Sequence, residues 1–240
     1  MGAIYAKTMG HKQIVHKPYT KQAPWLWRYG PLLTASTWIC EGLDTPGYSA
    51  AAGGTPTPVV GLPGATWNAV EYYTDTNSER NTDHFSLFAW IRPTLIAGAD
   101  RFILGKYDSG GPLGFRWYIR HTVAQQYAVF QTAGGTIAFT ENVTSISLNV
   151  WQLVGVTWDP DTGRATFYHN GEVTRTATGL SGSGAISASA VDLRIGVNSA
   201  LANPFVGSIA LPGCLDHCHL DVSDEHARWL FEEERHIFGV

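Results

Sequence analysis

The sequence predicts an all-β fold built from two antiparallel sheets, and three observations support this expectation. Alternating apolar and polar runs recur through the middle of the chain about every ten residues, a spacing typical of β-sandwiches. The 240 residues include 26 Gly and 12 Pro, only 15% are charged, and 9 Trp, 10 Tyr and 10 Phe supply material for one large core. Only the segment from Ser223 onward has a helical pattern.

The central predicted element is a long hairpin from Asn149 to Val173. In its first arm, one face carries Trp151, Leu153, Gly155 and Thr157, and the other carries Val154, Val156 and Trp158. Since apolar side chains lie on both faces, this strand should be central and buried between two layers. Asp159-Pro-Asp-Thr-Gly163 is a polar turn, and Asn170-Gly171 predicts a tight primed turn into a third strand.

Further strands are predicted on both sides of this hairpin. Their ranges are 85–93, 102–108, 114–120, 126–131, 136–140, 193–196 and 205–209, with a strand-like run at 67–73. In 114–120, one face carries Phe115, Trp117 and Ile119, and the other carries Arg116, Tyr118 and Arg120. Ser223 can cap a short C-terminal helix, which has Ala227, Leu230 and Phe231 on the side that packs against the sandwich.

The order of these motifs resembles the laminin-G-like, concanavalin A-like lectin and glucanase jelly rolls. The resemblance depends mainly on Trp-x-x-Val-x-Val-Thr-Trp-Asp at 151–159 and on Gly-Arg-x-x-Phe-Tyr-x-Asn-Gly at 163–171. Phe85–Pro93 resembles the first core strand of the family, and Phe102–Asp108 resembles the second. The resemblance covers roughly residues 65–240 and implies a two-sheet antiparallel jelly roll.

Residues 1–64 are predicted to form an extended N-terminal arm and a Gly/Pro-rich linker, ahead of the jelly roll at 65–240. Residues 1–40 hold five basic residues and no acid, whereas the rest of the chain has a net charge of −9. Prolines at 18, 24 and 31 forbid a continuous helix. The candidate partner-binding residues are Lys12, Lys17, Lys21, Trp25, Trp27, Arg28 and Tyr29. The alternative is that this segment supplies the first strand of the sandwich.

Catalysis is not expected. The glucanase branch of the family hydrolyses sugars with a Glu-x-Asp-x-x-Glu run, which places paired carboxylates on one strand face, and this chain contains no Glu-x-Asp. The nearest spacings are Glu71 with Asp75 and Glu79 with Asp83, in or beside a polar surface loop.

No cofactor is expected, although calcium is a candidate because many relatives bind it at the sandwich rim. Asp159 and Asp161 are the proposed ligands, and Asp75, Asp83 and Asp100 offer further oxygen atoms. Asp-Pro-Asp-Thr-Gly is equally an ordinary turn sequence.

The run Cys214-Leu-Asp-His-Cys-His219 suggests zinc, but a strand would hold the two cysteines about 13 Å apart, so buried free thiols are the preferred interpretation. Tyr72, Trp90 and Tyr118 could stack on sugar rings, although aromatic residues in such strands are more often part of the core.

Two function classes follow. The first is a non-catalytic structural or adhesive module, because a basic arm ahead of a jelly roll resembles the virion surface proteins of tailed phages. Its partners would be capsid or other virion chains, and its location the virion surface. The second is a carbohydrate-binding lectin module that is calcium-dependent if Asp159 and Asp161 bind the ion. The sequence shows no secretory signal, which predicts cytoplasmic synthesis, and neither a membrane nor a nucleic acid is an expected partner. A homo-oligomer is compatible with either class.

Overall fold

The computed structural model describes most of the chain from residue 85 onward, together with six strand segments before it. The described residues are 26–31, 37–41, 48–53, 57–58, 64–68, 72–75, 85–108, 113–132, 134–142, 145–180, 186–187, 189, 191–215 and 220–240. The strands before residue 85 are β1 (Leu26–Pro31), β2 (Thr37–Glu41), β3 (Tyr48–Gly53), β4 (Thr57–Pro58), β5 (Gly64–Asn68) and β6 (Tyr72–Asp75).

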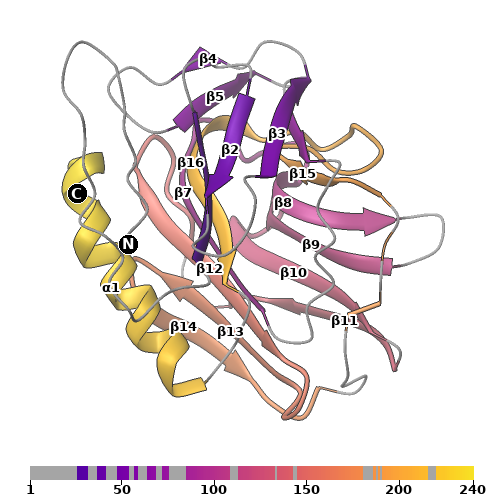
Figure 1. Cartoon of the computed structure of the whole chain (residues 1–240). Coiled ribbons are helices and arrows are strands. Elements are labelled where there is room, and N and C mark those ends of the chain that lie inside the picture. Colours follow the sequence, from indigo (N-terminus) through magenta and orange to yellow (C-terminus); the bar gives the residue numbers. More distant parts are fainter. Residues whose placement is uncertain are drawn as a thin grey trace.

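The strands of the main body lie close to the ranges expected from the sequence, except that the strand expected at 205–209 runs to Leu215. They are β7 (Phe85–Pro93), β8 (Arg101–Asp108), β9 (Leu113–Arg120), β10 (Gln125–Thr132), β11 (Gly135–Thr140), β12 (Gln152–Asp159), β13 (Arg164–His169), β14 (Glu172–Ala177), β15 (Leu193–Ile195) and β16 (Val206–Leu215). They form two antiparallel layers, β11-β10-β9-β8-β15 and β16-β7-β12-β13-β14 (Figure 1). The predicted all-β, two-sheet jelly-roll sandwich is confirmed.

The main core fills the space between the two sheets. Val154, Val156 and Trp158 of β12 point into it and are completely buried. Across the core, the ring of Phe130 in β10 stacks on Trp158 with centroids 5.5 Å apart. β12 pairs with β7 on one side and with β13 on the other, which confirms that it is a central strand.

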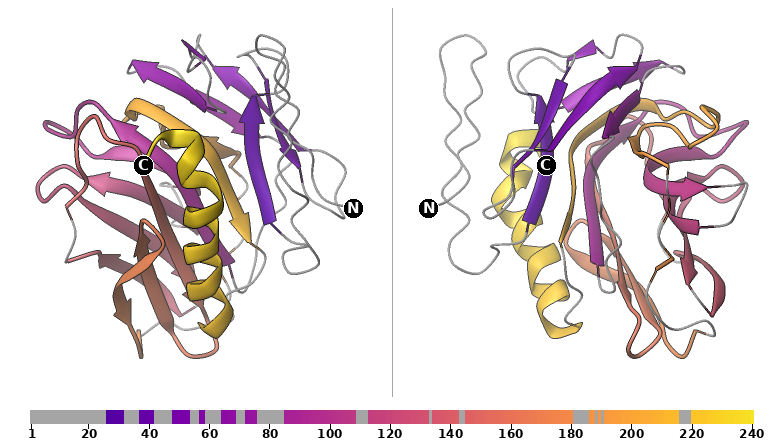
Figure 2. Two further views of the ribbon diagram at one scale, coloured as in Figure 1. Left: turned by 90° about the vertical axis from the view of Figure 1, so that its left-hand side faces the viewer. Right: turned by 45° about the vertical axis from the view of Figure 1, so that its right-hand side comes forward.

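The C-terminal helix α1 (Leu220–Phe238) covers the outer face of the sheet that contains β12, as the two views in Figure 2 show. The opposite face of β12 therefore meets a second core. In this core the ring centroid of Phe238 lies 4.9 Å from that of Trp151 and 4.3 Å from that of Trp90. The Trp90 indole N–H donates to buried Glu234 over 2.7 Å. The helix begins three residues before the predicted Ser223 and runs for 19 residues, longer than expected.

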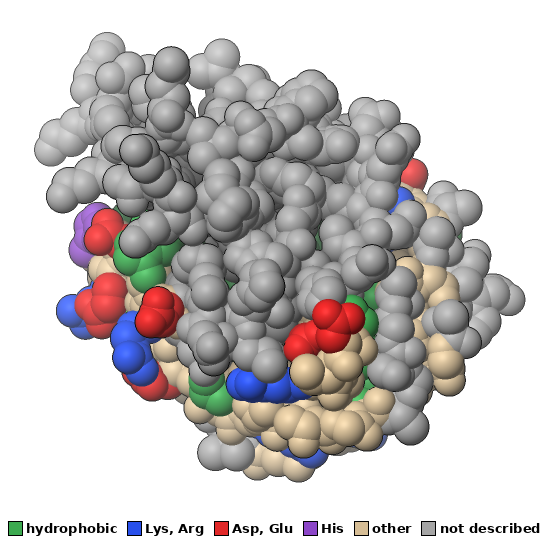
Figure 3. Space-filling view, turned by 60° about the horizontal axis from the view of Figure 1, so that its bottom comes forward, with side chains coloured by type: hydrophobic (Ala, Val, Ile, Leu, Met, Phe, Trp, Pro, Cys, Tyr) green, Lys and Arg blue, Asp and Glu red, His purple; other side chains and the backbone are tan. Residues whose placement is uncertain are grey.

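The exposed side of α1 is polar. It carries Arg228, Glu232, Glu233 and Arg235, and Arg235 pairs with Glu232 at 3.1 Å. Acidic and basic side chains are interspersed along the left edge of the face shown in Figure 3, the side on which α1 lies in Figure 1. In the part of the chain that the structure describes, no helix is both long and apolar enough to cross a membrane.

The Asn170-Gly171 turn has positive φ at both residues, 50° and 82°, as a primed hairpin turn requires. Glycine is needed at the second position for a further reason. A Cβ on Gly171 would lie 2.9 Å from the Cβ of Phe231, because α1 packs directly on this turn. Asn170-Gly171 therefore determines both the hairpin turn and the surface on which α1 packs.

The N-terminal segment contributes strands to the sheet. β1 pairs with β16 on one side and β2 on the other, and β2, β3 and β6 continue this path to β15, so these strands join the two sheets into one ladder. Pairing both edges of β1 satisfies its backbone groups and covers the edge of β16, which explains why the segment joins the sheet.

Trp27, Arg28 and Tyr29, three of the proposed arm residues, therefore lie in strand β1, and β2, β3 and β4 also fall within the predicted arm and linker at 1–64. The remaining proposed arm residues lie outside the described residues: Lys12, Lys17, Lys21 and Trp25. Their contact with a partner chain stays a prediction.

Candidate functional site

A small recess opens on the outer face of the β11-β10-β9-β8-β15 sheet, where β8 and β9 meet the loop between β15 and β16. Its cavity volume is about 60 Å³. The strands contribute Phe102, Tyr107, Arg116 and Tyr118, and the turn before β8 contributes Asp100. The loop contributes Asn198, Ser199, Ala200 and Asn203. Strand alternation explains the position of Arg116 and Tyr118, because their neighbours Trp117 and Ile119 point into the main core.

The aromatic floor of the recess depends on a glycine. A Cβ on Gly105 would lie 2.6 Å from Cζ of Phe102, so glycine leaves the space in which this ring lies across β8. Phe102 packs with Tyr118 and Val129 in a cluster separate from the main core, and Tyr127 lies against it. The ring centroids of Tyr118 and Tyr127 are 5.0 Å apart. Three neighbouring strands thus hold a rigid aromatic surface beside the opening.

Arg116 is held by rings rather than by an acid. Its guanidinium carbon lies 4.6 Å from the centroid of the Tyr107 ring and 5.6 Å from that of Tyr118, which are cation–π distances. Its Nε atom is buried and has no hydrogen-bond partner among the described residues. No acidic side chain of the described part of the chain forms an ion pair with Arg116. The guanidinium therefore keeps donors that a bound ligand could use.

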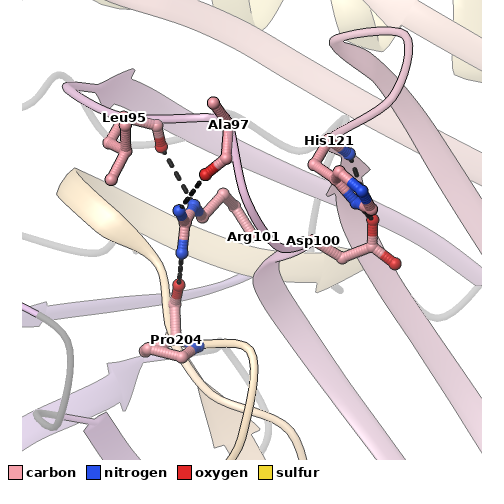
Figure 4. A network of polar contacts seen from close by, with 6 residues as sticks. All are labelled: Leu95, Ala97, Asp100, Arg101, His121 and Pro204. Atoms are coloured by element: carbon pink, nitrogen blue, oxygen red, sulfur yellow. Dashed lines mark hydrogen bonds and ion pairs between the residues drawn. The ribbon is translucent and has the colours of Figure 1, made fainter.

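Asp100 also lines the recess and is oriented by its contacts with His121. Its Oδ1 atom accepts a hydrogen bond from the backbone N–H of His121 over 3.1 Å and lies 2.8 Å from Nδ1 of the same residue (Figure 4). The structure gives Oδ2 no partner among the described residues, so this oxygen can accept a hydrogen bond from a ligand hydroxyl.

Next to Asp100, the buried Arg101 fixes the surrounding loops. It donates to the carbonyl oxygens of Leu95 at 3.1 Å, Ala97 at 2.6 Å and Pro204 at 3.4 Å (Figure 4). Burial lowers the pKa of Arg101, and Asp100 partly offsets this effect. Because its donors bind backbone oxygens from two loops, Arg101 positions the site and does not face a ligand.

The loop wall of the recess is also preorganised. Oδ1 of Asn198 accepts from the backbone N–H groups of Ala200 at 3.0 Å and Ala202 at 2.8 Å. Arg194 donates to the carbonyl oxygens of Asn198 and Ser199, at 3.2 and 2.7 Å. The backbone N–H of Phe102 donates to the carbonyl oxygen of Asn203, which links this loop to β8. A ligand would meet a wall that is already ordered.

The three aromatic candidates from the sequence have different outcomes. Tyr118 lines the recess, where only 8% of the residue is exposed, and burial raises its pKa. Trp90 is completely buried beneath α1, so the expectation that it could stack on a sugar is wrong, because the helix covers that sheet face. Tyr72 lies in β6, and its side chain is outside the described part of the structure.

The proposed calcium ligands lie in the turn between β12 and β13. Both carboxylate oxygens of Asp159 bind within this turn: Oδ1 accepts from the backbone N–H of Asp161 at 2.9 Å, and Oδ2 from the Thr162 hydroxyl at 2.6 Å. Asp161 is exposed. Among the described residues, no group of three or more His, Cys, Asp or Glu side chains is placed to hold a metal. The geometry gives Asp159 a role in the turn, and calcium binding stays a prediction.

The other predicted chemistry lies largely outside the described residues. Asp75 ends β6 and pairs in register with Leu193, but its side chain is not described, and Glu71, Glu79 and Asp83 fall in undescribed segments. Cys214 lies in β16 opposite Leu87, while Cys218 and His219 are outside the described range. The thiol and zinc alternatives both stay predictions.

Comparison with known proteins now identifies the family. A model of the concanavalin A-like lectin/glucanases superfamily, of the laminin G type, matches residues 68–211, which is more than half of the chain. The chain belongs to this superfamily. No curated protein matches the sequence.

Solved structures support the same fold at low sequence identity. The botulinum neurotoxin serotype G binding domain has a TM-score of 0.59 and 13% identity over 88% of this chain and 50% of its own. The serotype D ligand binding domain in complex with N-acetylneuraminic acid has a TM-score of 0.61 and 13% identity over 88% and 51%. A Trypanosoma rangeli sialidase in complex with a difluoro nononic acid has a TM-score of 0.60 and 14% identity over 98% and 36%.

The chain spans about half the length of the neurotoxin domains it matches. At these identities the likeness shows the fold alone. None of these similarities points to a virion, so a phage origin and attachment to a capsid stay predictions.

Sequence reasoning missed most of the recess. It did place Arg116 and Tyr118 together on one face of the strand at 114–120, and an arginine beside tyrosines on a strand face is a usable signal of a binding surface. It did not find Tyr107, Ser199 or the Asn198 loop, because nothing local in the sequence shows that residues 198–203 fold back against β8.

Proposed function

We propose that this member of the superfamily is a non-catalytic carbohydrate-binding module and that the recess beside Arg116 is its sugar site. The observation that carries the proposal is the convergence of tyrosine rings, Arg116 and the free oxygen of Asp100 at one preorganised opening. The superfamily includes lectins, and two structural neighbours were solved with sugar acids bound, which supports the proposal at the level of the fold.

The chemistry of the recess matches that of a sugar ring. Tyr107 and Tyr118 offer apolar ring surface for the C–H groups of a saccharide, and Asp100 offers an acceptor for its hydroxyl groups. A volume of about 60 Å³ cannot enclose a whole oligosaccharide. The recess instead suits one terminal or branching residue of a glycan, whose other residues would lie outside the recess.

The arrangement also supports a binding role rather than hydrolysis. Glycoside hydrolysis needs two carboxyl groups about 5 to 9.5 Å apart on either side of the scissile bond. Asp100 is the only carboxylate among the described residues that line the recess. We therefore expect no release of reducing sugar from β-glucans, and release that one Glu→Gln change abolishes would contradict this.

A pair of matched substitutions tests the site. Ala200 lines the recess and Ala138 lies on the outer face of β11, away from it, and both are exposed. Ala200→Trp should fill the opening and abolish the binding of any glycan that the native protein retains on a glycan array. Ala138→Trp adds the same ring elsewhere and should leave binding unchanged. Equal binding by both variants would place the sugar site elsewhere.

A further inference from the structure

We propose that the recess selects saccharides that carry a carboxylate group and that Arg116 binds this carboxylate. This inference rests on the proposed carbohydrate-binding function and narrows it to a class of ligand. The recess would then hold an acidic sugar, such as a uronic or a nonulosonic acid, with the carboxylate toward Arg116 and the hydroxyl groups toward Asp100.

Arg116 has hydrogen-bonding capacity that is not used within the described structure. A guanidinium offers five N–H donors in a plane whose spacing matches the two oxygens of a carboxylate. In the described structure, Arg116 contacts the faces of Tyr107 and Tyr118, which attract its charge without accepting its in-plane N–H donors. Its buried Nε has no hydrogen-bond partner, which is an unfavourable state that a carboxylate in the recess can relieve.

The charge around the recess is also consistent with an anionic ligand. The strand positions that share the outer face with Arg116 include Arg120, which lies 5.2 Å from the centroid of Tyr127. On β8 to β11 the other outward positions, alternate residues in register with Arg116, carry no Asp or Glu among the described side chains. This part of the sheet therefore presents an excess of positive charge, which favours an anionic ligand.

The acidic side chain in the recess favours an acidic sugar over a simple or highly charged anion. Asp100 lines the same recess and already engages His121 through Oδ1. A second carboxylate or a phosphate that filled the recess would lie close to this acid and be repelled by it. A ligand with one carboxylate at one end and hydroxyl groups at the other satisfies both Arg116 and Asp100, and the tyrosine rings provide its apolar contact.

The experiment compares charged and neutral forms of the same sugar. Binding of N-acetylneuraminic acid and of glucuronic acid is measured by titration calorimetry beside that of their methyl esters, which keep the ring but lose the charge. We expect the ester to bind about 10- to 100-fold more weakly than the acid. Arg116→Gln should weaken the binding of the acid by a similar factor and change the binding of the ester little. Arg116→Lys should keep only part of the native affinity for the acid, because an ammonium group lacks the planar set of N–H donors of a guanidinium.

Arg120→Gln is the matched control. Arg120 lies on the same strand and the same face and also contacts a tyrosine ring, but it does not line the recess. Its substitution should therefore change the affinity for the acid by less than about threefold. A urea denaturation midpoint for each variant establishes that it is folded, and the ester comparison needs no variant.

The outcomes separate this inference from the proposed function. Equal binding of acid and ester, or of native protein and Arg116→Gln, would overturn the role of Arg116 while leaving sugar binding intact. If acetate competes as well as the sugar acid, the recess is a simple anion site and the inference fails. If no saccharide of either kind binds, the proposed function fails with it.

Discussion

His169 should make the stability of the domain depend on pH. Its ring is buried at the end of β13, and burial lowers its pKa from 6.5 to about 4. The ring atom Nε2 lies 3.0 Å from Oε1 of Gln152. The Nε2 atom of Gln152 donates to the carbonyl oxygens of Ser147 and Val150, which fixes Oε1 as the acceptor and Nε2–H as the protonated nitrogen of His169.

Protonation would place a second N–H on Nδ1 of His169. This atom is buried and has no hydrogen-bond partner among the described residues, so the charged ring is disfavoured in the folded state. The unfolded chain binds the proton more readily between about pH 6.5 and pH 4, and stability therefore falls as the pH drops through this window. The shift predicts a loss of about 2 kcal/mol by pH 5 and about 3 kcal/mol by pH 4.

Urea denaturation at about pH 7.5 and pH 5, for the native protein and for His169→Gln, measures this effect. Glutamine can keep the bond to Gln152 but cannot titrate, so the variant should lose about 2 kcal/mol less than the native protein over this range. Glu141 acts in the opposite direction, because burial raises its pKa and its folded-state cost is relieved as the pH falls. Because Glu141 is present in both proteins, its contribution cancels when their pH dependences are compared. An equal pH dependence in the two proteins would show that His169 is not held neutral by the fold.

Three further changes test the architecture. Trp151→Ala should lower the free energy of unfolding by about 3–5 kcal/mol in urea, because 93% of this residue is buried between β12 and α1; a loss below about 1 kcal/mol would contradict that packing. Gly171→Ala should cost about 1–3 kcal/mol in the same assay, more than Gly179→Ala, which also has positive φ but no neighbour within 4 Å of the added Cβ. Deleting residues 1–31, which removes β1, should lower the melting temperature measured by circular dichroism compared with deleting residues 1–25; equal melting temperatures would restore the arm interpretation.

The sequence was most informative where side chains alternate between two environments. The strand predicted at 114–120 is observed as β9 with nearly the same bounds, because apolar side chains alternate along it with Arg116, Tyr118 and Arg120. Asn170-Gly171 likewise located a turn, since few residue pairs accept two positive φ values. Where the pattern was physical and local, prediction and structure agree.

The N-terminal strands could not be predicted in the same way. β3 has the sequence Tyr-Ser-Ala-Ala-Ala-Gly, and its small side chains give no alternation, so its place in the sheet depends on backbone pairing with β2 and β6. The prediction that Trp90 could stack on a sugar was wrong for a related reason, because the helix that buries this residue comes from the far end of the chain. The recess combines a strand face, which alternation reveals, with a loop position set only by tertiary contacts such as those of Arg194.

The most direct test of the account is to locate the bound sugar by NMR. With ring-labelled tyrosine and ¹⁵N-labelled arginine and tryptophan, titration with N-acetylneuraminic acid should shift the signals of Tyr107, Tyr118 and Arg116 Nε–H together as the sugar binds. The indole signals of Trp90 and Trp151, buried on the helix side, should stay unchanged. Shifts confined to the helix side, or no shift in the recess while calorimetry detects binding, would contradict the assignment of the sugar site to this recess.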